Sequence, residues 1–371
     1  MKKQIIIFLL FSIQLSAQNP HFPKVKIDVP CTQEFVDNYK GKWLIPPDAL
    51  INSPNRDFSQ GAMKELHDIQ KLILEAYPQP TGADGYWSGL YSKRYFAEKV
   101  KYINENGRSR RESVSANPVS GWRYSLGLSP WYCDDENKKQ IWNGYPDVGD
   151  GDGLVIAANN VEAIINGTIM EDDIGTINGQ EIKYKMPVIG KWKGYDVMCV
   201  VAADLANDRH VLISRNGTLP YIPVSRKQYL ERAIAYVTKF YDETIAFTDK
   251  DPDKDQAAEN RKRMIKDKND ILKKYEEAEE ESTKKGLLDS TAIIQRLAMF
   301  SFDETIFSSE SEGGRMLVID NPNYYRKDLP GYVPQLFVLE WNWGKLKLAA
   351  DFRKAIEENF PIEKLQAMID K

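Results

Sequence analysis

Histidine and cysteine are scarce in this chain of 371 residues, with three of each. His21, His67 and His210 lie far apart in the sequence, and neither HExxH nor paired CxxC occurs, which argues against a zinc site. The glycine-rich phosphate loops and the GxSxG motif of many hydrolases are also missing. The sequence therefore carries no signature of the common metal, nucleotide or serine-nucleophile chemistries.

Long apolar runs are lacking except near the first residue, where Ile5 to Ile13 form one within MKKQIIIFLLFSIQLSAQ. Lys2 and Lys3 precede this run and small residues follow it, which is the order of a secretory signal peptide, and we place it at residues 1–17. The run is shorter than the roughly 20 residues that span a bilayer, and no later run is long enough. We therefore expect an exported protein, periplasmic or extracellular, without a membrane span.

An excess of positive charge is lacking too, since 50 basic and 54 acidic residues give a formal charge of -4. This balance argues against a nucleic-acid partner, which proteins bind largely through the phosphates. The apolar fraction of 42% is that of an ordinary globular protein, and the length favours two domains. In an oxidising compartment, Cys31, Cys133 and Cys199 allow one disulfide and one remaining thiol. The choice of pair, or a fully reduced set, stays open.

The patterning of apolar residues predicts an α+β fold. Their three- and four-residue spacing in residues 62–76 predicts an amphipathic helix, and four short apolar segments from residue 153 onward predict strands. We expect the helix to pack on antiparallel strands, followed by a charged helical hairpin and a C-terminal strand–helix unit. The expected ranges are an extended N-terminal segment at 18–60, an α+β domain at 61–248, the hairpin at 249–300 and the last unit at 301–371, which completes the first domain or stands apart.

The most patterned stretch is LPYIPVSRKQYL, residues 219–230. Asn216-Gly217 before it predicts a two-residue turn, so that 211–215 and 218–222 would form a β-hairpin, with its prolines marking an edge strand. Ser225 and Gln228 have the spacing of a capping box at a helix start.

Arg226 and Lys227 in the first turn of this helix run against the usual preference for acidic residues there. Free N–H groups and two cations suit a carboxylate or phosphate, so we expect a ligand-binding site at Arg226 and Lys227, flanked by Tyr221 and Tyr229. The alternative is that the two basic side chains extend into solvent or pair with acids elsewhere.

Charged residues dominate from Asp249 to Lys285, where helical spacing places acids and bases next to each other. Ile293, Ile294, Leu297 and Phe300 then predict a second helix, which would complete the helical hairpin. Such an arm is either solvated or docks on a partner.

Two further stretches are candidate sites. Asp147, Asp150 and Asp152 in DVGDGDG offer carboxylates on a flexible loop for calcium, although turn chemistry alone explains them. Trp131 belongs to an aromatic-rich segment that either stacks on sugar rings or fills a core. No other cofactor is expected.

The signal ending in SAQ, the segment NGTLPYIPVSRKQYL and the later PQLFVLEWNW resemble exported proteins of unknown function from Bacteroidetes-type Gram-negative bacteria. The resemblance implies the periplasm or the cell exterior and carries no catalytic residue. We expect a non-catalytic protein that binds a small anionic ligand, a glycan or an envelope protein. The alternatives are a secreted hydrolase acting on glycan or peptide and a structural or assembly protein of the cell envelope.

Overall fold

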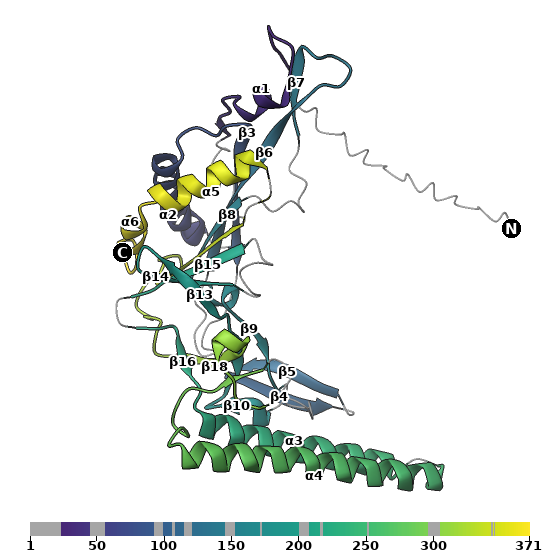
Figure 1. Ribbon diagram of the computed structural model, residues 1–371. Helices are drawn as coiled ribbons and strands as arrows, with labels where there is room; N and C mark the ends of the chain where they lie inside the picture. Colours follow the sequence, from purple (N-terminus) through teal and green to yellow (C-terminus); the bar gives the residue numbers. More distant parts are fainter. Residues whose placement is uncertain are drawn as a thin grey trace, which may run out of the picture.

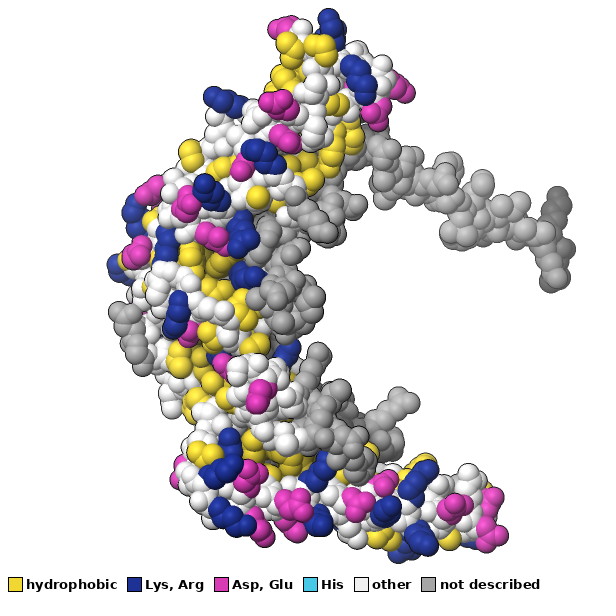
Figure 2. Space-filling view, in the orientation of Figure 1, with side chains coloured by type: hydrophobic (Ala, Val, Ile, Leu, Met, Phe, Trp, Pro, Cys, Tyr) yellow, Lys and Arg dark blue, Asp and Glu magenta, His cyan; other side chains and the backbone are white. Residues whose placement is uncertain are grey.

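The structure is a computed structural model. It describes residues 24–44, 56–92, 99–105, 108–114, 121–144, 153–170, 173–199, 208–215, 218–250, 252–295, 305–342, 344 and 346–371. The body is elongated and curved, and a long pair of helices projects from one end of it (Figures 1 and 2).

A ten-stranded sheet forms the larger part of the body. All of its pairings are antiparallel except β2 with β3. Its main path runs through β1 (Lys24–Lys26), β7 (Gln140–Asn143), β6 (Gly121–Cys133), β8 (Gly153–Ala158), β19 (Phe337–Asn342), β15 (Asp208–Ile213), β14 (Tyr195–Met198) and β13 (Val188–Trp192), while β3 (Ala83–Ser92) joins β2 (Trp43–Leu44) to β6.

Helices α2 (Arg56–Ala76), α5 (Lys347–Asn359) and α6 (Ile362–Gln366) pack with this sheet in one apolar core. The predicted stripe of α2 forms part of it, since Leu66, Ile69 and Ile73 are buried. Phe352 and Ile356 of α5 pack into the same core. The predicted helix on antiparallel strands and the C-terminal strand–helix unit are therefore confirmed.

A second, smaller sheet follows the order β16 (Tyr221–Pro223), β18 (Arg315–Asp320), β12 (Lys183–Lys185) and β9 (Ile165–Thr168), with β17 (Ile293–Ile294) also on β18. Helices α3 (Arg226–Thr248) and α4 (Lys254–Lys284) pack on it around Tyr229 and Tyr275. The remaining short elements are α1 (Gln33–Asp37), the β-pairs β4 (Lys99–Glu105) with β5 (Arg108–Val114) and β10 (Thr176–Ile177) with β11 (Gln180–Glu181), and the 3-10 turns η1 (Val161–Ala163), η2 (Asp173–Gly175) and η3 (Glu310–Glu312).

The predicted β-hairpin around residues 216–217 is wrong. Strand β15 pairs with β14 and β19 in the large sheet, whereas β16 pairs with β18 in the small one. The chain therefore crosses between sheets here, and the turn itself lies outside the described residues. The edge position of β16 is confirmed, because it pairs only with β18 among the described strands.

The predicted helical hairpin exists, but its partners are α3 and α4 (Figure 1). The segment expected to be its second helix instead contributes Ile293 and Ile294 to strand β17. Gly286, with φ of +67°, follows α4 in the left-handed conformation that commonly ends a helix. Residues 296–300 lie outside the described part of the chain.

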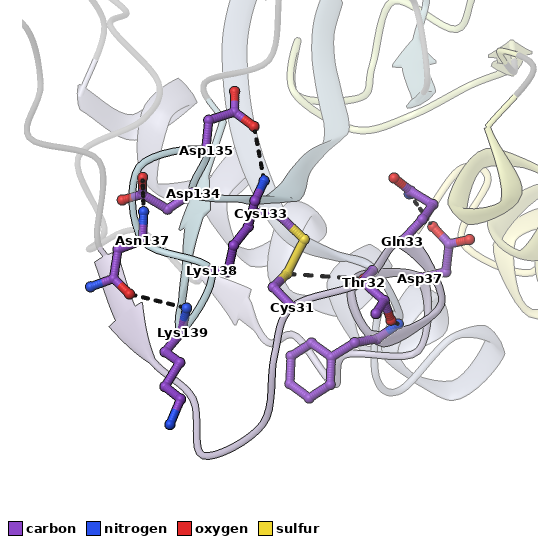
Figure 3. Close-up of a disulfide and its surroundings, with 11 residues drawn as sticks. Cys31, Thr32, Gln33, Asp37, Cys133, Asp134, Asp135, Asn137, Lys138 and Lys139 are labelled. Atoms are coloured by element: carbon purple, nitrogen blue, oxygen red, sulfur yellow. Dashed lines mark hydrogen bonds and ion pairs between the residues drawn. A yellow bond between two sulfur atoms is a disulfide. The ribbon is translucent and has the colours of Figure 1, made fainter.

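A disulfide joins Cys31 to Cys133, and Cys199 is a buried thiol. Figure 3 shows that the bridge ties the segment before α1 to the end of β6. The pairing left open by the sequence is thereby decided. In the described ranges, no helix is long and apolar enough to cross a bilayer.

Candidate functional site

The start of α3 is a capping box, as the sequence predicts. The Ser225 hydroxyl accepts from the Gln228 N–H at 3.2 Å, and the Ser225 N–H donates to Gln228 Oε1 at 3.0 Å. Val224 on one side and Tyr229 on the other are buried and fix the direction in which the chain enters the helix.

The free N–H groups predicted at this helix start are not free. The Arg226 N–H donates to the Ser290 carbonyl at 2.9 Å, and the Lys227 N–H donates to the Leu288 carbonyl at 2.9 Å. Carbonyl oxygens of the loop after α4 thus cover the positive end of the helix dipole. The backbone N–H groups expected to bind an anion are therefore already bonded to carbonyl oxygens of the chain. These carbonyls also explain why two basic residues are tolerated at the helix start.

The Arg226 side chain reaches toward the C-terminal end of the neighbouring helix α4. Its guanidinium carbon lies 4.4 Å from the centre of the Phe307 ring, and its Nη1 is 3.4 Å from the Ser282 hydroxyl. Helix C-terminal ends and aromatic faces both favour a cation. The Nε of Arg226 is enclosed and has no hydrogen-bond partner within the described structure.

A pocket of about 520 Å³ opens beside this guanidinium. Its walls are Arg226 at the start of α3, one side of α4 from Lys274 to Ser282, Lys285 and Leu287 just after α4, and residues 305–309 with Glu312. The volume falls within the range of small-molecule sites. We call this cavity the α3–α4 pocket.

Basic and acidic side chains both line the α3–α4 pocket, and two of its carboxylates are held by hydrogen bonds. Lys285 donates to Glu281 at 2.6 Å, and this hydrogen bond lowers the pKa of Glu281. Hydrogen bonds from the Ser309 hydroxyl at 2.8 Å and the Ser309 N–H at 3.0 Å lower the pKa of Glu312. Ser308 also donates to Glu312, at 3.2 Å. Both carboxylates are therefore ionised at neutral pH and already engaged.

The other residues expected at this site lie elsewhere. Lys227 is exposed and is not among the described residues that line the pocket. Tyr229 is buried among Tyr275 and Phe307, with ring centres 6.3 and 6.0 Å away. Tyr221 is 9% exposed, and burial raises its pKa to about 12. Of the four predicted residues, only Arg226 faces the pocket.

Trp131 belongs to the core at the disulfide end of the molecule. It is 6% exposed and packs with Val36 and Ile141, so the core reading of this residue is confirmed. The alternation of β6 turns the next residue, Tyr132, outward, where its ring lies 5.0 Å from that of Trp142.

The calcium candidates Asp147, Asp150 and Asp152 lie outside the described residues. Within the part of the chain that is described, no group of three or more His, Cys, Asp or Glu side chains could hold a metal ion.

A second cavity, of about 380 Å³, lies beside Arg215 and the C-terminal residues, but its arginine is occupied. Arg215 donates to Asp370 Oδ1 at 2.7 Å and to Gln335 Oε1 at 2.6 Å, and its guanidinium lies 4.8 Å from the Tyr324 ring. An anion could bind here only by displacing Asp370. The α3–α4 pocket is therefore the better candidate.

The sequence did not indicate most residues of the α3–α4 pocket. Phe307, Ser308 and Ser309 follow a stretch with no motif, and Lys285 looks like an ordinary helix-end lysine. The signal that the sequence did carry was Arg226 itself, and the antiparallel pairing of α3 with α4 brings this residue beside the end of α4. Neither a protein-family model, nor a curated protein, nor a solved structure matches this chain.

Proposed function

We propose that the protein is a non-catalytic binding protein whose α3–α4 pocket takes a small ligand bearing a carboxylate or phosphate group. One observation carries the proposal: the Arg226 guanidinium borders a cavity of about 520 Å³ and forms no ion pair with a carboxylate among the described residues. An anionic group in the cavity would give this cation a charge-assisted hydrogen bond, which is among the stronger kinds in proteins.

The side chains that line the α3–α4 pocket, among the described residues, suit ligand binding better than hydrolysis. No histidine or cysteine is among these lining residues, and the Ser308 and Ser309 hydroxyls already donate to Glu312. A hydrolase needs a nucleophile or water held by a base that is ready to take a proton. The hydrogen bonds that lower the pKa of Glu312 make that carboxylate a weaker base.

The test is thermal melting of the chain from residue 18 onward against dicarboxylates, sugar acids, inorganic phosphate, neutral glycans, and calcium with and without chelator. A ligand at a hundred times its dissociation constant adds about 2.7 kcal/mol to the native state, which raises the midpoint by several degrees. We expect an anionic ligand to raise it. The calcium arm tests the DVGDGDG loop separately.

Arg226→Ala should weaken the binding of that anion by about 10- to 100-fold, as expected for a charged hydrogen bond worth roughly 1.5–3 kcal/mol. Lys227→Ala is the matched control, because this neighbouring base is exposed and does not line the pocket. Equal affinity in the two variants, or no anion-induced shift at all, would contradict the proposed site.

We also propose that the protein is exported. The apolar run after Lys2 and Lys3 supports this, and so does the Cys31–Cys133 disulfide, because disulfides persist mainly in oxidising compartments. Fractionation of cells that produce the full chain tests it, with the protein expected outside the cytoplasm and shortened by about 17 residues.

Assembly through the helical arm is a second candidate function. The large apolar residues Tyr229 and Leu230 near the start of α3 are buried. Further along the arm, Phe240 is 43% and Phe247 is 77% exposed, and Ile265 of α4 is 41% exposed. Exposed aromatics on a projecting element are typical of a docking surface. If two copies pair there, the mass of the wild-type protein measured by sedimentation should rise with its concentration. The double variant Phe240→Ser/Phe247→Ser should keep the mass of a monomer at every concentration. A monomeric wild-type protein at every concentration would rule this out.

A further inference from the structure

Strand β12 carries two lysines on the same face of the small sheet, and both are largely enclosed. Lys183 and Lys185 have side chains that are 16% and 4% exposed. Tyr184, between them, points to the opposite face and packs in the core with α3 and α4. A lysine is rarely buried unless its charge is paired, so the partner of each ammonium group shows what that lysine does.

Lys185 is paired with the segment that forms one wall of the α3–α4 pocket. Its Nζ donates to the Met186 carbonyl at 3.0 Å and lies 3.8 Å from Oε1 of Glu310. This Oε1 atom is buried and has no hydrogen-bond partner among the described residues. The ion pair therefore joins β12 to η3 next to residues that line the pocket, without lining the pocket itself.

Hydrogen bonds join residues 308–312 to one another. Ser309 and Ser308 donate to the Glu312 carboxylate, the Glu312 N–H donates to the Ser309 carbonyl at 3.1 Å, and Glu310 lies between them. A change in the position of Glu310 is therefore expected to move the serines and the carboxylate that line the pocket. Lys185 itself does not line the pocket.

The Lys185–Glu310 ion pair is not explained well by a contribution to the stability of the whole protein. Burial lowers the pKa of Lys185, while the charge of Glu310 acts in the opposite direction. Replacing a buried ion pair by apolar groups is often neutral or stabilising, whereas a buried pair can specify one arrangement of the elements that it joins.

We propose that Lys185 is a positioning residue for the α3–α4 pocket: by holding Glu310 it fixes the 308–312 wall against β12 and keeps the pocket in its binding geometry. The expected effect of Lys185 on ligand affinity rests on the proposed function, because it requires that the pocket binds an anion. Its effect on the wall itself can be measured without any ligand.

Lys183 supplies a matched control. It lies two residues earlier on the same strand and face, and its ammonium is paired with Asp320 at 2.8 Å. Asp320 belongs to β18 and is not among the described residues of the pocket wall. Lys183→Met thus removes a comparable charge from the same strand without touching η3.

Hydrogen exchange of the full chain, read by mass spectrometry, tests the wall directly. In Lys185→Met, amides of residues 305–314 should exchange about 10-fold faster, while those of α3 and the large sheet should be unchanged. Glu310→Gln should do the same, and because Glu310 is partly exposed, this variant tests the idea even if Lys185→Met fails to fold. Lys183→Met should leave the 305–314 rates unchanged.

Affinity for whichever anion raises the melting midpoint provides the second readout. Lys185→Met and Glu310→Gln should each weaken it about 10-fold, and the double variant should be no weaker than either single one, because both break the same contact. A purely structural role would instead lower the melting midpoint and leave the affinity of the folded protein unchanged.

The outcomes separate the two proposals. Faster exchange at 305–314 without any anion binding supports the positioning role and overturns the proposed function. Binding that depends on Arg226, with normal exchange and affinity in Lys185→Met and Glu310→Gln, supports the function and overturns the positioning role.

Discussion

At the scale of single residues, two arginines illustrate opposite uses of the same side chain. Arg215 donates hydrogen bonds to Asp370 and Gln335 within the protein. Arg226 instead lies on an aromatic ring, and its Nε has no hydrogen-bond partner among the described residues. The sequence singled out Arg226, because a base in the first turn of a helix breaks a local rule. It could not show that loop carbonyls cap the backbone or that Phe307 supports the guanidinium, because both contacts come from distant segments.

The clamp between Arg215 and Asp370 should contribute to stability. Asp370→Asn keeps the shape of the side chain but removes its charge, leaving a largely enclosed guanidinium without its carboxylate, so we expect a loss of about 1–3 kcal/mol in the free energy of unfolding. Asp328→Asn is the control, because its ion pair with Arg326 is exposed and should contribute less than about 1 kcal/mol. Urea unfolding of both variants measures the difference, and equal losses would contradict a special role for the clamp.

At the scale of elements, local patterns predicted several helices correctly but not their partners, and the helix predicted around Ile293 and Ile294 is a strand. The capping box at Ser225 and the apolar spacing of 62–76 depend on neighbours within a few residues, and both predictions were confirmed. The partner of β16 is β18, which lies far away in the sequence, and the partner of α4 is the helix before it rather than the segment after it. Both pairings depend on tertiary packing, and the sequence assigned both to the wrong partners. The same limit applies to the pocket, which exists only because these partners meet.

The Cys31–Cys133 bridge should stabilise mainly the end of the molecule that it joins. It closes a loop with a sequence separation of 102, for which the chain-entropy estimate is about 4.7 kcal/mol. The local core there includes Val36, Trp131 and Ile141. Cys31→Ser/Cys133→Ser should therefore lower the unfolding free energy by about 2–5 kcal/mol and expose Trp131.

Tryptophan fluorescence and limited proteolysis of residues 24–44 would report this local loss. Reductant should reproduce it in the wild type and have no effect on the double variant. If the double variant keeps the wild-type protection of this segment, the bridge is not what holds it.

At the scale of the whole molecule, buried tyrosines link stability to alkaline pH. Burial raises the pKa of Tyr221, Tyr275 and Tyr324 to about 12, and it also raises the pKa of Tyr229 and Tyr325 well above the ordinary value. An unfolded tyrosine has a pKa of about 10, so above that pH the native state binds more protons than the unfolded state. The stabilisation from these groups is therefore complete below about pH 10 and is lost as the pH rises through about 12.

We expect the free energy of unfolding to fall between about pH 10 and pH 12, by up to about 1.4 kcal/mol per pH unit for each such tyrosine. Lys185 acts in the opposite direction, because burial lowers its pKa, but it is a single group. Urea unfolding across this range, with absorbance to follow tyrosinate, is the measurement. Tyr275→Phe should reduce the slope, and a pH-independent free energy would contradict the burial of these hydroxyls.

The place of β19 in the large sheet constrains the order in which the protein can fold. This strand, Phe337–Asn342, lies between β8 and β15, so residues 153–158 and 208–213 are joined only through a strand that comes more than a hundred positions later in the chain. A growing chain that has not yet emerged to residue 342 has two separate half-sheets with unpaired inner edges. Pairing of the two half-sheets must therefore wait until residue 342 is available, and until then those edges need protection from aggregation.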